Sequence, residues 1–90
     1  MANLRKIKKD ITFLVGEVVS DCYQLWSFHP DGKEQELEGI LLEALELHNS
    51  LRQRVNAAPK DGVKQHYRAI SSDLLKGADK LFTKMGELAK

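Results

Sequence analysis

Five residues of this chain have side chains that could support catalysis or hold a metal ion: Asp21, Cys22, His29, His48 and His66. A zinc site needs all of its nitrogen, sulfur or oxygen ligands within about 2.3 Å of one point. No HExxH, CxxC or glycine-rich phosphate motif groups any of these residues. Because they are spread along the chain, whether they converge depends on the elements that carry them.

Two clusters of turn-forming residues divide the chain into three segments of similar length. These clusters are HPDGK and AAPKDG, where glycine and proline interrupt long periodic stretches. Asp31 followed by Glu34 is typical of a capping box that opens a helix, and Asp61 is a good N-cap for the segment after it. The resulting prediction is three helices, near 3–28, 32–57 and 62–88.

Each predicted helix has one apolar face, since apolar residues recur at spacings of three and four. The three faces carry Ile7, Ile11, Leu14, Val18, Cys22 and Leu25; Leu37, Ile40, Ala44, Leu47, His48, Leu51 and Val55; and Val63, Tyr67, Ile70, Leu74, Ala78, Leu81 and Met85. Short connections make neighbouring helices antiparallel. The sequence therefore predicts an all-α fold, an up-down-up three-helix bundle of long antiparallel helices, with residues 1–90 as a single domain.

In such a bundle the candidate chemical groups do not converge. A rise of about 1.5 Å per residue places His48 and His66 toward one end, and Asp21 and Cys22 toward the other. We therefore predict no catalytic site, no metal and no cofactor, so that the protein is not an enzyme. His48 lies well inside the apolar face of its helix and is expected to be a core or boundary histidine with one satisfied hydrogen bond, to Ser71, with a ligand or a pH switch as the alternative. Cys22 is expected to be a small core residue.

The distribution of charge is more informative than its sum, a formal +1 in a chain that is 30% charged and 42% hydrophobic. Antiparallel packing gathers nine cations at one end against Asp10 and Asp61, a net of +7, while the other half, in which Glu46 and Asp73 are counted, carries −6. The nine cations, called the basic end, are Arg5, Lys6, Lys8, Lys9, Arg52, Arg54, Lys60, Lys64 and Arg68. They indicate either an anion or nucleic-acid contact or a solvated end without a ligand.

A second pattern runs along the first helix, opposite its apolar face. Two aromatic and three small residues lie there at three- and four-residue spacing, namely Phe13, Gly16, Ser20, Tyr23 and Ser27. We call these five residues the outer stripe. Small residues allow a partner helix to approach closely, and the aromatics supply apolar area to bury. The stripe predicts self-association as a homodimer, and scattered surface aromatics are the alternative.

The stretches DITFLVGEVVSDCYQLWSFHPDG and LEALELHNSLRQRVN resemble small uncharacterised all-helical proteins of bacteria. The resemblance is one of length and pattern, and it implies no activity and no functional residues. The longest uncharged run, ITFLVG, is far shorter than the roughly 20 apolar residues of a membrane span. With one cysteine, no intrachain disulfide can form, which favours a cytoplasmic location. We expect a non-enzymatic protein that acts through protein–protein contacts, with nucleic-acid binding at the basic end as the alternative.

Overall fold

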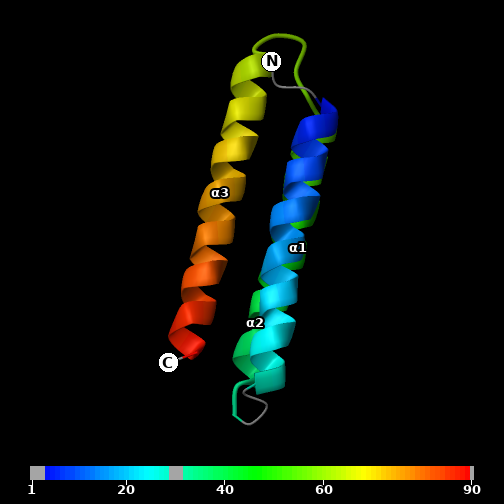
Figure 1. Ribbon diagram of the computed structural model, residues 1–90. Helices are drawn as coiled ribbons and strands as arrows, with labels where there is room; N and C mark the ends of the chain where they lie inside the picture. The colour runs from blue at the N-terminus through cyan, green and yellow to red at the C-terminus, as the bar shows by residue number, and fades with distance from the viewer. Residues whose placement is uncertain (1–3, 29–31, 90) are drawn as a thin grey trace.

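Three long helices account for most of the chain. The computed structural model describes residues 4–28 and 32–89, which form α1 (Leu4–Phe28), α2 (Glu34–Asn56) and α3 (Val63–Leu88). Figure 1 shows the start of α1 beside the α2–α3 connection, and the end of α3 at the opposite end of the molecule. The molecule is a rod of 50 × 18 × 17 Å. All three helices contact one another, so the predicted all-α three-helix bundle is confirmed.

The core is one continuous seam along the rod. Among the side chains whose burial the structure describes, five in each helix are apolar and buried, and these are Ile7, Ile11, Val15, Val18 and Cys22 of α1, Leu37, Ile40, Ala44, Leu51 and Val55 of α2, and Ile70, Leu74, Ala78, Leu81 and Met85 of α3. Burying a large aliphatic side chain contributes about 1.5–3 kcal/mol. The predicted apolar faces therefore form the core, although Val63, at the first position of α3, remains 37% exposed.

Neither α2 nor α3 begins with the cap that the sequence predicts. The N-cap residues are Lys33 and Gly62, and neither makes a side-chain capping hydrogen bond. The prediction that Asp61 caps α3 is wrong, because the chain enters that helix through Gly62 with φ of +73°, a left-handed conformation that favours glycine. Asp31, which the sequence predicts as the first residue of a capping box, lies outside the described residues.

Side chains near the start of one helix bond carbonyls at the end of its neighbour, at both ends of the α2–α3 pair. Lys33 Nζ donates to the carbonyl oxygen of Leu88 in the last turn of α3. At the other end of the rod, His66 Nε2 donates to the carbonyl oxygen of Arg54, at 2.6 Å. The last carbonyls of a helix carry partial negative charge and have few partners within the helix, so both bonds add a donor to acceptors at helix ends.

Two ion pairs also connect α2 with α3. Arg54 Nη1 lies 2.7 Å from Asp73 Oδ2, and Lys84 Nζ lies 2.8 Å from Glu43 Oε1. All four side chains remain more than a third exposed, so each pair contributes only about 0.2–1 kcal/mol.

The helices do not have the composition of membrane spans. Over the described part of the chain, none combines enough length with enough apolar character to cross a bilayer.

Candidate interaction surfaces

The described side chains that could support catalysis or bind a metal ion lie apart from one another. Cys22 is fully buried in the core, while the neighbouring Asp21 is exposed. His48 and His66 lie half-buried on α2 and α3, each with a partner of its own, while His29 falls outside the described residues. Within residues 4–28 and 32–89, no three His, Cys, Asp or Glu side chains are grouped so that they could hold a metal ion.

The hydrogen-bond partner predicted for His48 is wrong. Its Nδ1 lies 3.4 Å from the side-chain oxygen of Asn49, its neighbour in α2, in an exposed contact. Ser71 instead lines a hollow between α1 and α3. His48 therefore contacts its neighbour in the same helix instead of a residue of α3. The reason is that His48 lies at the edge of the apolar face rather than at its centre. The contact is long and exposed, so it contributes little to stability.

Cys22 is a core residue with one polar contact. Its Sγ donates to the carbonyl oxygen of Leu37 at 3.5 Å, across the α1–α2 interface. Burial disfavours the charged thiolate and raises the pKa of the Cys22 thiol above its ordinary value of 9.0. Nucleophilic chemistry needs the thiolate, so a thiol in this environment is inert toward substrates.

The basic end lies where the sequence predicts it. The start of α1, the end of α2 and the start of α3 meet at one end of the rod (Figure 1). Six of its nine cations are exposed and three half-buried; the exposed ones are Arg5, Lys6, Lys9, Lys60, Lys64 and Arg68.

The net charge of this end is smaller than the sequence count. Asp73 pairs with Arg54 and lies before the midpoint of α3, while Glu46 lies past the midpoint of α2, so both carboxylates belong to the basic half of the rod. Nine cations therefore face four carboxylates, a net formal charge of +5 instead of +7, and the opposite half carries −4 instead of −6. The polarity of the rod remains, but Arg54 is committed to an ion pair.

The outer stripe of α1 is exposed at all five positions. Phe13 is 65% exposed and Tyr23 is 59% exposed, large values for aromatic side chains. A Cβ atom added to Gly16 would meet no atom within 4 Å, so the backbone of α1 is open to solvent at that point. The structure thus leaves aromatic area uncovered on the side of α1 that faces away from the core.

An apolar groove between α1 and α3 was not predicted. It consists of two adjoining hollows of about 150 and 380 Å³, which share Leu14 and Leu75. The remaining lining residues are Asp10, Phe13, Ser71 and Leu74 in the first hollow, and Ala78, Asp79 and Phe82 in the second. The sequence carries a signal for it: Leu75 and Phe82 directly follow core residues, seven positions apart, which places them on one flank of α3.

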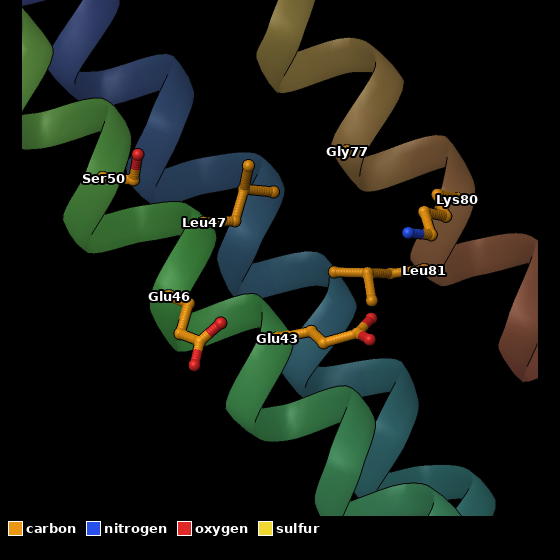
Figure 2. Close-up of a pocket in the computed structure, with 7 residues that line it drawn as sticks. All are labelled: Glu43, Glu46, Leu47, Ser50, Gly77, Lys80 and Leu81. Carbon is orange, nitrogen blue, oxygen red and sulfur yellow. The ribbon is translucent and has the colours of Figure 1, made fainter.

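A third hollow, of about 400 Å³, lies between α2 and α3 (Figure 2). Its floor is apolar, with Leu47 and Leu81, and its rim is polar, with Glu43, Glu46 and Lys80. Gly77 marks a close approach of the two helices, since a Cβ atom there would lie 2.8 Å from both terminal methyl groups of Leu47. The hollow is wide and open, and charges of both signs surround it, so its lining selects no single class of ligand.

Comparison with known proteins leaves these surfaces to be interpreted from their own geometry. No protein-family model, curated protein or solved structure matches the chain.

Proposed function

We propose that this protein is a non-enzymatic helical protein that acts through protein–protein contacts, and that one of its partners is a second copy of the chain. The observation that carries the proposal is the exposure of Phe13 and Tyr23 on the outer stripe, opposite the core. Aromatic side chains are enriched at protein interfaces because they bury a large apolar area. A cytoplasmic location belongs to the same proposal, since the lone cysteine, Cys22, forms no disulfide.

A bundle of this size has a physical reason to associate. A chain of 90 residues buries a smaller fraction of its surface than a larger domain does, so covering apolar area with a partner adds stability that the monomer lacks. The large apolar side chains left exposed occur on all three helices, with Phe13, Tyr23 and Phe28 on α1, Leu42 and Leu45 on α2, and Val63 and Leu75 on α3. On the outer stripe, Phe13 and Tyr23 adjoin small residues that a partner can approach.

Sedimentation of the purified chain at tens of micromolar tests the proposal. We expect a dimer for the wild type and a monomer for Gly16→Arg, because the new side chain projects from the middle of the stripe. The matched control is Gly39→Arg on α2, since a Cβ atom at Gly39 also meets nothing within 4 Å. The control is expected to remain dimeric. A wild type that sediments as a monomer of 10.2 kDa contradicts self-association.

The second candidate function is binding of a polyanion such as DNA or RNA at the basic end. The observation that favours it is that three separate segments bring their cations to one end of the rod. Phosphate contacts of this kind weaken steeply as salt rises, because binding releases condensed counterions.

The test uses two pairs of charge reversals on the same helix. Lys64→Glu with Arg68→Glu is expected to weaken DNA and RNA binding for all sequences alike and to lower the dependence on salt. Lys76→Glu with Lys80→Glu is the control, because both lysines are exposed and lie in the acidic half. Equal effects of the two pairs, or no binding at low salt, contradict this function.

A further inference from the structure

We propose that two copies of the chain pack antiparallel along α1, so that Phe13 of each copy occupies the α1–α3 groove of the other. This inference rests on the proposed function. It adds the orientation of the two copies and the site at which their main apolar contact forms. Three observations carry it: the position of the groove, the position of Phe13 beside it, and the placement of charge on either side of the middle of α1.

The larger hollow has the size and lining that an aromatic ring needs. Its volume is about 380 Å³, and its apolar walls are Leu14, Leu75, Ala78 and Phe82. An engineered apolar cavity of about 150 Å³ is enough to bind benzene. Leu75 is 61% exposed and stands at the rim, so a ring that enters the hollow also covers this leucine. The hollow is open to solvent, which allows a side chain of a partner to enter without rearrangement of the core.

The levels along the rod match for an antiparallel pair. Consider a two-fold axis that crosses α1 near residue 15, one position from Gly16. Phe13 lies two residues before this axis, about 3 Å along the helix. The two-fold rotation therefore places Phe13 of the second copy two residues past the axis, at the level of residue 17. Leu14 and Leu75 line both hollows, so they lie at one level along the rod. Residue 17 follows Leu14 by three residues, as Ala78 follows Leu75, and α1 and α3 run in the same direction. Ala78 therefore lies at the level of residue 17. The ring of one copy therefore lies at the level of the larger hollow of the other.

Charge selects the antiparallel orientation over the parallel one. Lys9 and Asp21 are both exposed and lie six residues on either side of residue 15. In the antiparallel pair, Lys9 of each copy meets Asp21 of the other, so the contact forms twice. Over the whole rod, the half with +5 lies against the half with −4. A parallel pair would instead bring like charges together, which is unfavourable.

A charge exchange within one chain tests the orientation. Lys9→Glu alone and Asp21→Lys alone are each expected to raise the dissociation constant of the dimer about tenfold, because each puts like charges together twice. The double variant Lys9→Glu/Asp21→Lys restores both contacts with reversed signs, so it is expected to return to within about threefold of the wild type. The two residues are about 18 Å apart on one helix, so no contact within a chain can produce this rescue.

A leucine pair tests the groove. Leu75→Lys is expected to dissociate the dimer, since a charge then lies at the mouth of the hollow. Leu42→Lys is the control, because Leu42 is 55% exposed on α2 and lines neither hollow of the groove. Circular dichroism of each variant checks that the helices are intact. Sedimentation then measures the dissociation constants.

The outcomes separate this inference from the proposed function. Loss of the dimer with Leu75→Lys, retention with Leu42→Lys and rescue by the charge exchange support it. A dimer that Gly16→Arg dissociates, but that is insensitive to Leu75→Lys or unrescued by the double variant, overturns the antiparallel arrangement and leaves self-association through the outer stripe in place. A monomeric wild type overturns both.

Discussion

His66 Nε2 lies 2.6 Å from the carbonyl oxygen of Arg54, so a side chain from the first turn of α3 closes the last turn of α2. The same carbonyl oxygen also accepts from the backbone nitrogen of Ala57, at 3.3 Å. A helix end is thus completed by a residue that is twelve positions away in the sequence. Since a carbonyl oxygen can only accept, the proton of the bond belongs to His66.

His66→Ala is expected to destabilise the fold by about 1 kcal/mol, the net contribution of one hydrogen bond. His48→Ala is the matched control, because His48 is also half-buried but has only a long, exposed contact with Asn49. We expect its effect to be below about 0.5 kcal/mol. Urea unfolding followed by circular dichroism measures both free energies. A larger loss for His48 than for His66 contradicts the assignment.

His48→Leu is a separate test of the position on α2. A lightly bonded boundary histidine loses little when an apolar side chain replaces it, so the free energy of unfolding is expected to stay equal or to rise. A loss of several kcal/mol would instead show that His48 takes part in a network or binds a ligand. The same urea titration gives the answer.

Gly77 is expected to respond to alanine differently from Gly39. Gly39→Ala meets no atom within 4 Å and should stabilise the fold by about 0.5–1 kcal/mol, through higher helix propensity. Gly77→Ala places its Cβ atom 2.8 Å from two methyl groups of Leu47, so part of that gain is lost when Leu47 moves. In a Leu47→Ala background the full gain should return. Equal effects of Gly77→Ala in both backgrounds would contradict the close approach.

The turn before α3 is expected to need glycine but not aspartate. Gly62 has φ of +73°, so Gly62→Ala should destabilise the fold by about 1 kcal/mol. Asp61→Ala should change the free energy of unfolding by less than about 0.5 kcal/mol, because Asp61 caps no helix. Thermal and urea unfolding of the two variants compare these values directly. The reverse order would restore Asp61 as the cap.

Cys22 should react with thiol reagents only when α1 separates from α2. Its side chain is fully buried and bonds Leu37, so labelling by a disulfide reagent at neutral pH is expected to be at least about a thousandfold slower in the native protein than in denaturant. Absorbance of the released thiol gives both rates. Fast labelling of the native protein would contradict the burial.

The same thiol gives a dependence of stability on pH. Burial raises the pKa of Cys22 in the folded state, so folding favours the protonated form. This contribution is fully present below the pKa of the unfolded thiol and is lost as the pH rises above it, toward the raised value. The free energy of unfolding should therefore fall more steeply above about pH 9 for the wild type than for Cys22→Val. Identical slopes would contradict the raised pKa.

The periodicity of the sequence was sufficient for the fold because one physical effect dominates it. A long helix with one apolar face can bury that face only against other helices, and the two turn clusters leave few ways to arrange three of them. The positions of the caps were less predictable. Asp61 has good cap chemistry, yet the conformation of Gly62 decides where α3 begins, and φ is not visible in residue types.

The candidate surfaces were predictable where they depend on spacing along one helix or on which helix ends meet. The outer stripe follows from spacing along α1 alone. The α1–α3 groove depends on how far apart two helices stand, and the bond from His66 to Arg54 depends on the height of one helix relative to another. The charge count erred for a simpler reason. The predicted helix bounds already place Asp73 before the midpoint of its helix and Glu46 past the midpoint of its own, and the ion pair of Asp73 with Arg54 agrees with that placement.

The separation of charge along a rod 50 Å in length makes the molecule a permanent electric dipole. A field exerts a torque on such a body, even though its net charge is only +1. Near a negatively charged surface or polymer, the rod turns so that the basic end, with the α2–α3 connection, points toward the negative charge. Near another copy, the same torque aligns the two rods in opposite directions before any side chains touch. In the proposed pair, orientation would thus be set during the approach, over distances comparable to the Debye length of about 8 Å at physiological salt.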